Sequence, residues 1–260
     1  MIRSNYHTHT VFSDGANTPE EMVLAAIDLG LESIGFSDHS MTYFHPNWSI
    51  ADEKFALYMQ TVGELKEKYK DRIRVYCGLE QDYMSPPPMA GLDYLIGSVH
   101  WLQVGEKHLQ LDHSRKVLID GINELYGGDP DALAEAYYDL VGRFAENPAI
   151  TFIGHFDLIT KFDQTDPLFL PTERYTAAWQ NAAKKLIAAG KIFEMNTGAI
   201  SRGYRTEPYP SPEILRFWGE NGAKVIINSD SHHVSTLTTA FDRAEALALR
   251  YGCNLVDLFQ

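Results

Sequence analysis

The chain contains 260 residues, of which 45% are hydrophobic, and it carries a formal net charge of −13. This length allows one domain, residues 1–260, with a large buried core, and the acidic balance argues against nucleic acid as a partner. No stretch reaches the roughly 18 apolar residues of a membrane span and the N-terminus carries no signal peptide, so we expect a cytoplasmic location and no membrane contact.

Seven short apolar runs alternate with helical patterns along the chain. The runs are continuous in their apolar character, as expected for strands that are buried on both faces of a parallel sheet. The predicted strands are roughly 2–7, 33–37, 73–79, 94–99, 150–154, 191–195 and 223–228. Helical periodicity marks the segments 52–70, 129–146 and 172–189.

Local signals predict several helix ends. Thr18 offers an N-cap that is followed by Pro19 and by a reciprocal glutamate, Glu21. Ser211-Pro212 repeats the cap-then-proline signal, and Gly190 closes the segment before it. Repeated strand–helix alternation predicts a parallel α/β barrel with fewer than the usual eight units.

Two segments interrupt this alternation. Residues 40–51 are too aromatic for an ordinary solvated loop, and residues 101–128 form a long connection. Both would lie at the carboxyl ends of the strands, where loops shape substrate pockets, although apolar packing over the barrel rim is equally compatible.

The two cysteines form no metal or redox motif, and Cys77 lies in an apolar run, which predicts an inert buried thiol.

Residues of metal-ligating types follow most of the predicted strands. His7-Thr8-His9 ends the first run, and the two-residue period of a strand puts both imidazoles on one face. Later strands end at Asp38-His39, Glu80, His100, His155 and Asp230-Ser231-His232. One such histidine alone would usually be a core residue. Six of them at equivalent positions predict a multinuclear metal site at the carboxyl ends of the strands.

The donors are nitrogen and oxygen atoms without a thiolate, which suits zinc, manganese or iron. The sequence does not choose among these metals. Asp38 and Asp157 lie next to candidate ligands and could orient imidazoles, although surface or capping roles are equally compatible.

The order of these residues resembles the polymerase-and-histidinol-phosphatase (PHP) family of metal-dependent phosphoesterases. The segments 78–83, 93–101, 154–159, 196–202 and 207–212 are similar to its histidinol-phosphatase branch. The last two segments are the most specific to the branch, because they have no obvious role in binding metal. The resemblance implies a distorted (β/α)7 TIM-like barrel that holds three divalent transition-metal ions at the C-terminal ends of its strands.

The resemblance also implies a ligand set, position by position. The ligands are His7, His9 and Asp230 for the first ion, Glu80 as a bridge with His100 and His155 for the second, and Asp14, His39 and His232 for the third. Asp14 is replaced by histidine in some family members, and Ser13-Asp14-Gly15 is also ordinary turn sequence.

The implied enzyme is a metal-dependent phosphoric monoester hydrolase that uses a metal-bridging hydroxide as its nucleophile. Three divalent ions would leave the cluster with a net charge of roughly +2, which would let an acidic protein hold a phosphate dianion. The branch implies histidinol-phosphatase activity in histidine biosynthesis, with the small metabolite L-histidinol phosphate as substrate and L-histidinol and phosphate as products.

Other residues are candidates for contact with the substrate. Arg202 is the first choice to stabilise phosphoryl charge, because it follows the sixth strand within a branch-like segment. Asp157, His233 or a metal-bound water could protonate the leaving group. Weaker candidates for substrate binding are Lys161, Arg205, Tyr43, His45, Trp48, Trp101 and His233. A solvated surface role is the simple alternative for each cation.

Three alternatives remain open. The chain could be a PHP-family phosphoesterase that acts on nucleotides or on another small phosphomonoester. It could be an amidohydrolase-type barrel that cleaves C–N bonds, although such barrels often use a bridging lysine and no lysine ends a predicted strand here. It could also be a barrel without activity that binds a metal or a partner. The sequence favours no particular oligomeric state.

Overall fold

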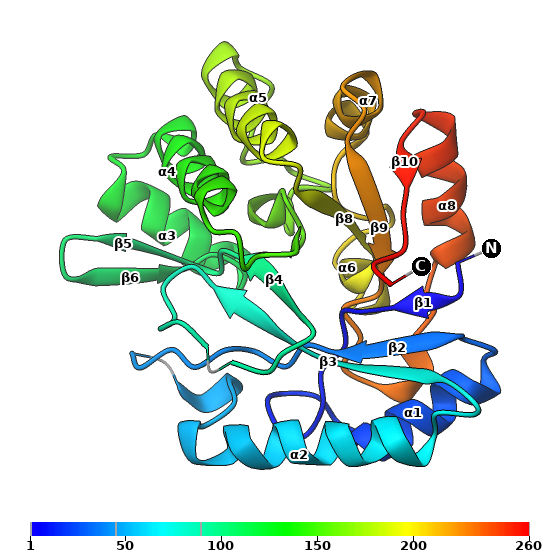
Figure 1. Ribbon diagram of the computed structural model, residues 1–260. Helices are drawn as coiled ribbons and strands as arrows, with labels where there is room; N and C mark the ends of the chain where they lie inside the picture. Colours follow the sequence, from blue (N-terminus) through cyan, green and yellow to red (C-terminus); the bar gives the residue numbers. More distant parts are fainter. Residues whose placement is uncertain (1, 45, 89, 260) are drawn as a thin grey trace.

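The computed structural model describes residues 2–44, 46–88 and 90–259. Within these ranges eight parallel strands form one curled sheet in the order β1-β2-β3-β4-β7-β8-β9-β10, and the helices pack around its outside (Figure 1). The expected distorted TIM-like barrel is confirmed, as are all seven predicted strands. The strands are β1 Ser4–Asn5, β2 Ser33–Phe36, β3 Arg74–Asp82, β4 Tyr94–Ser98, β7 Phe152–Ile153, β8 Ile192–Asn196, β9 Lys224–Asn228 and β10 Asn254–Leu255.

The outer layer follows the predicted alternation. Its longer helices are α1 Pro19–Asp28, α2 Asp52–Lys68, α4 Pro130–Arg143, α5 Glu173–Ala188, α7 Pro212–Glu220 and α8 Phe241–Arg250. The capping box of Thr18 and Glu21 is formed at the start of α1. Gly190 adopts φ 72° just after α5, as expected for a helix stop. Ser211 precedes α7 as predicted, but its side chain makes no capping hydrogen bond.

The segment 101–128 has more structure than the sequence predicted. Strands β5 Trp101–Val104 and β6 Lys107–Gln110 form an antiparallel hairpin, and α3 Arg115–Leu125 follows it. The hairpin projects from the carboxyl end of β4, beside α3 (Figure 1). Shorter helices complete the chain: η1 Pro46–Trp48, η2 Phe144–Glu146, η3 Leu158–Thr160, α6 Gly198–Ser201 and η4 Val234–Thr236.

Two cores support the barrel. The larger core lies between the sheet and the helices, and a smaller one comprises Tyr6, Tyr94, Ile96, Phe152 and Ile226. Tyr94 Oη donates hydrogen bonds to the carbonyl oxygens of Tyr6 (2.6 Å) and Phe36 (3.0 Å), which ties three strands together. The C-terminal segment joins the smaller core, because the ring of Phe259 stacks on Tyr76 with centroids 3.8 Å apart.

The sheet closes at its carboxyl end. Just after β1 and β9, an isolated parallel bridge joins Thr8 to Ser231, with His9 N donating to Ser231 O at 2.8 Å. A similar bridge joins His39 to Glu80 after β2. The first bridge joins the segments that follow β1 and β9, the second joins those of β2 and β3, and both include or adjoin predicted ligands.

Cys77 and Cys253 are free and buried, as the apolar surroundings of Cys77 predicted. Burial raises the pKa of Cys77 to about 12, which keeps the thiol protonated. Among the helices of the described ranges, none is both long enough and apolar enough to cross a membrane.

Candidate metal centre

The predicted ligands converge at the carboxyl ends of the strands. Seven of the nine line one cavity of about 220 Å³: Asp14, His39, Glu80, His100, His155, Asp230 and His232. The other two, His7 and His9, are fully buried. The structure therefore brings all nine side chains into one cluster.

Glu80, on β3, lies at the centre of five imidazoles. Its Oε1 lies 2.8 Å from His155 Nε2 and 3.4 Å from His100 Nε2, and its Oε2 lies 2.8 Å from His39 Nδ1, 3.3 Å from His7 Nε2 and 3.6 Å from His9 Nε2. Two ligands bound at about 2.1 Å in tetrahedral geometry would be about 3.4 Å apart. The observed spacings are therefore compatible with ligand atoms that share an ion. Burial alone would raise the pKa of Glu80, but the nearby imidazoles of His7 and His39 hold it well below its usual value.

Several buried polar atoms in this cluster lack a hydrogen-bond partner. They are His7 Nε2, both ring nitrogens of His9, His39 Nδ1, His155 Nδ1 and Glu80 Oε2. Burying an unsatisfied donor or acceptor costs about 1–3 kcal/mol, so such atoms should be few. Here they gather around one carboxylate, and His39 Nδ1 lies close to Glu80 Oε2 without hydrogen-bond geometry. This donor set fits divalent ions.

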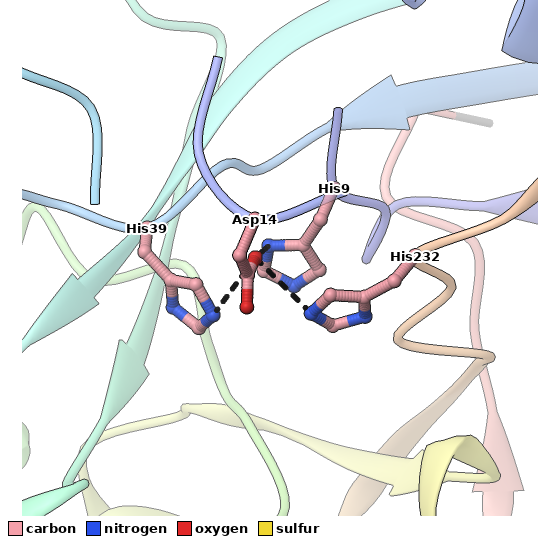
Figure 2. Close-up of side chains that lie close together, drawn as sticks. All are labelled: His9, Asp14, His39 and His232. Atoms are coloured by element: carbon pink, nitrogen blue, oxygen red, sulfur yellow. Dashed lines mark ion pairs between the residues drawn. The ribbon is translucent and has the colours of Figure 1, made fainter. Parts of the chain in front are cut away.

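One subset of the cluster surrounds Asp14 (Figure 2). Asp14 Oδ1 lies 3.2 Å from His232 Nε2, 3.7 Å from His39 Nε2 and 3.9 Å from His9 Nδ1. The imidazole of His9 stacks on that of His232, with centroids 4.1 Å apart. The group that could hold an ion here thus contains four residues, one more than the predicted set for the third ion.

Other potential groups share residues across the predicted sites. They are His7, His155 and Asp230; His7, His9 and Glu80; and His39, Glu80 and His100. The geometry supports a contiguous cluster in which Glu80 and several imidazoles lie between neighbouring sites.

Asp230 is held in an unusual conformation by a close-packed neighbourhood. Its φ of 49° lies in the left-handed region, which costs a non-glycine residue free energy and often marks a functional site. Arg202 Nη2 donates to Asp230 Oδ2 at 2.8 Å, and Arg202 Nη1 donates to the Asp230 carbonyl at 3.1 Å. Burial would raise the pKa of Asp230, but Arg202 and His7 hold it well below the usual range.

Glu194, a residue of metal-ligating type at the end of the sixth predicted strand, is a functional candidate to which the sequence analysis assigned no role. This fully buried carboxylate on β8 accepts from His7 Nδ1 at 2.7 Å and Asn228 Nδ2 at 3.0 Å through Oε1. Its Oε2 accepts from His155 N and Asn196 Nδ2, both at 2.9 Å. With four donors it is fully occupied, so it serves to orient His7, whose Nε2 then faces the cluster.

Asp82 has the same relationship to another imidazole. Its Oδ2 lies 2.8 Å from His100 N and 3.2 Å from His100 Nδ1. Asp82 lies two residues after Glu80 on the same strand, so the two carboxylates point to one face of β3. The two-residue spacing from Glu80 is visible in the sequence and could have identified Asp82.

Asp38 and Asp157, for which orienting an imidazole was one of the open roles, have other partners. Asp38 accepts from Thr10 N at 2.7 Å and from Ser13 Oγ at 2.5 Å, and so shapes the loop that carries Asp14. Asp157 Oδ2 accepts from Ser211 N at 2.9 Å, and Asp157 is not among the residues that line the cavity. This position does not support Asp157 as the acid for the leaving group.

The predicted substrate contacts divide into two groups. Arg202, Lys161 and Trp48 line the cavity, and the Trp48 ring lies edge-on to His39 at 4.1 Å. Arg205 is not among the residues that line this cavity. It donates to Thr160 Oγ1, and its guanidinium lies over the ring of Tyr209.

Three of the remaining candidates, Trp101, His233 and Tyr43, are not among the residues that line the cavity. Trp101 is buried and packs edge-on against Phe44 at 5.0 Å. His233 is exposed, and its Nδ1 accepts from Ser235 N. Tyr43 is 67% exposed. His45 lies outside the described residues.

Imidazoles and carboxylates gathered at the carboxyl ends of a parallel α/β barrel, with cations beside them, define a metal-dependent hydrolase. The family model for the PHP domain matches residues 5–198, and the chain belongs to this family. The family predicted from the sequence is therefore confirmed.

Relatives of known name agree with this assignment. A protein from Schizosaccharomyces pombe, named as a probable histidinol-phosphatase, is 27% identical over 260 residues, which cover 89% of this chain and 80% of that protein. One of the same name from Deinococcus radiodurans is 29% identical and covers 87% of this chain and 85% of that protein. The histidinol phosphate phosphatase of Lactococcus lactis, solved with Zn, L-histidinol and phosphate, shares the fold at a TM-score of 0.74 and 21% identity, over 98% of this chain and 95% of that one.

Proposed function

We propose that this protein is a metal-dependent phosphomonoesterase that hydrolyses L-histidinol phosphate to L-histidinol and phosphate. The observation that carries the proposal is the convergence of five imidazoles on Glu80, in a cavity that Arg202 and Lys161 also line. The names of the relatives support the substrate. The ligands bound by the Lactococcus protein agree with it. A cytoplasmic location and a single domain remain predictions from the sequence.

Three divalent ions would be held by the nine residues of the cluster. His7, His9 and Asp230 would hold the first, with Glu80 as a bridge to the second beside His100 and His155. Asp14, His39 and His232 would hold the third, with His9 close by. Zinc, manganese and iron all suit these donors. When bound, the ions would acidify a coordinated water and stabilise negative charge on the phosphoryl oxygens.

Arg202 has two tasks in this proposal. It fixes Asp230 through two hydrogen bonds, and its remaining N–H groups can donate to phosphoryl oxygens in the cavity. The planar guanidinium suits both because its donors form a rigid fork. Lys161 adds a second positive charge on the wall of the same cavity.

The direct test is phosphate release after reconstitution of the metal-free protein with Mn, Zn or Fe. The panel contains L-histidinol phosphate, AMP, a bis-phosphorylated nucleotide and an aryl phosphate. We expect the highest kcat/KM with L-histidinol phosphate. A higher value with a nucleotide would favour the alternative substrate class, and release from no monoester would refute the proposal.

The site itself is tested by variants of its centre. Glu80→Ala and His100→Ala should lower the rate by orders of magnitude, because each removes a donor from the cluster. His108→Ala is the matched control, since His108 is an exposed histidine on the nearby hairpin. Turnover near the wild-type value in either site variant, with circular dichroism unchanged, would contradict the assignment.

A further inference from the structure

One wall of the cavity is built by the hairpin that the sequence did not predict. Gln110, at the end of β6, and Asp112, just beyond it, both line the cavity. Leu111 between them is fully buried, and its N–H donates to the carbonyl oxygen of His100 at 2.9 Å. Asp112 is therefore held in a fixed place relative to the metal cluster.

The carboxylate of Asp112 is only half satisfied. Lys161 Nζ donates to Asp112 Oδ2 at 3.2 Å and to the Asp112 carbonyl at 2.9 Å. The second oxygen, Oδ1, is buried and has no hydrogen-bond partner. A buried carboxylate oxygen without a donor is costly, and its natural complement is a positively charged N–H group.

The charge of the Asp112 carboxylate also favours a positively charged N–H group as its partner. Burial alone would raise the pKa of Asp112, but Lys161 and His100 hold it below its usual value. The carboxylate is thus an anion at neutral pH, although it lines a cavity that is expected to bind a phosphate anion. An anion in the wall of this cavity favours a substrate that carries a positively charged group as well as its phosphate.

We propose that the Asp112 carboxylate accepts a hydrogen bond from an ammonium group of the substrate, so that the site selects phosphomonoesters of amino alcohols. The proposal rests on the proposed function and specifies how the same cavity tells its substrate from other monoesters. The phosphate lies toward the metal cluster and Arg202, and the ammonium lies toward the hairpin wall. The cavity volume of about 220 Å³ suits a small molecule of this kind.

The test compares two substrates that differ only in the ammonium group: L-histidinol phosphate and 3-(imidazol-4-yl)propyl phosphate. For the wild-type protein we expect kcat/KM to favour the amine by tenfold or more. In Asp112→Asn the side chain keeps its size and loses its charge, and we expect this ratio to fall at least tenfold, mainly through KM. In Lys161→Met we expect both substrates to be affected in parallel.

Each outcome decides the question. A wild-type protein that turns over both substrates equally overturns the proposal without any variant, so a failure of Asp112→Asn to fold does not protect it. A parallel loss for both substrates in Asp112→Asn also overturns it, because Asp112 would then act only through Lys161. Absence of phosphate release from either substrate in the wild type would instead refute the proposed function.

Discussion

The substitution Glu194→Gln tests whether an oriented imidazole is needed for metal binding. Glu194 accepts four hydrogen bonds, two at each carboxylate oxygen. Glutamine has nearly the same shape, but one of its two terminal groups is a donor. The substitution therefore changes hydrogen bonding with little change in volume.

The size of the expected effect follows from the hydrogen-bond partners of Glu194. If the amide oxygen stays next to His7 and Asn228, the amide NH₂ faces His155 N and Asn196 Nδ2, which are also donors. The opposite orientation leaves the other pair without an acceptor. A buried donor that loses its acceptor costs about 1–3 kcal/mol, so we expect the free energy of unfolding to fall by about 2 kcal/mol or more. Because His7 is then less well oriented, metal affinity should fall about 10–100-fold.

The assay is a competition titration of the metal-free variant against a chelating dye, with thermal unfolding measured in parallel. Asp157→Asn is the control, because Asp157 is also fully buried but accepts from Ser211 and Thr160 rather than from an imidazole. The control should lose stability while its metal affinity stays within about twofold of wild type. Wild-type metal affinity in Glu194→Gln would refute the reasoning, whatever its stability.

Further predictions concern the ions, the packing beside the site and the thiols. At free metal 100 times the Kd, each bound ion should add about 2.7 kcal/mol, so a chelator should lower the Tm by roughly 5–11 °C per site; calorimetry that shows no change would contradict metal binding. Gly198→Ala should lower kcat/KM at least tenfold, because its Cβ would lie 2.7 Å from Asp230 Oδ2. Gly63→Ala has no atom within 4 Å of the added Cβ and should leave kinetics unchanged. Because burial raises the pKa of Cys77 to about 12 and of Cys253 to about 11, neither thiol should react with a disulfide reagent until guanidinium unfolds the protein; fast labelling of the native protein would disprove this.

The strands of the barrel could be predicted because each one is a continuous apolar run that becomes buried on both faces. For β2 and β4 every residue is buried, as this pattern requires. β10 could not be found in the same way, because neither of its two residues is buried, and its one strand partner is β9. The β5–β6 hairpin had a usable signal, the two-residue turn Gly105-Glu106 between strand-forming residues.

The ligands could be predicted because strand ends meet at one mouth of a parallel barrel, whatever the details of packing. The residues that orient them depend on which face each side chain takes. Asp38 is next to His39 in sequence, but adjacent residues of an extended segment point to opposite faces, and Asp38 turns toward the loop 10–14. The orienting role of Glu194 is recognised only when the curled sheet brings His7, which follows β1, close to β8, and the one-dimensional pattern does not show this.

The wall of the cavity leads to a last prediction about the order of binding. Among its described lining residues, the four carboxylates of Asp14, Glu80, Asp112 and Asp230 face the two cations Lys161 and Arg202, an excess of two negative charges. Metal-bound imidazoles are neutral, so one divalent ion only balances the wall and further ions make it positive. Phosphate should therefore bind after the metals: calorimetric titration should detect inorganic phosphate binding to the metal-loaded protein and none to the chelated protein at the same pH. Equal affinity in both forms would mean that the protein's own cations hold the phosphate, and it would remove the electrostatic argument for a cluster of several ions.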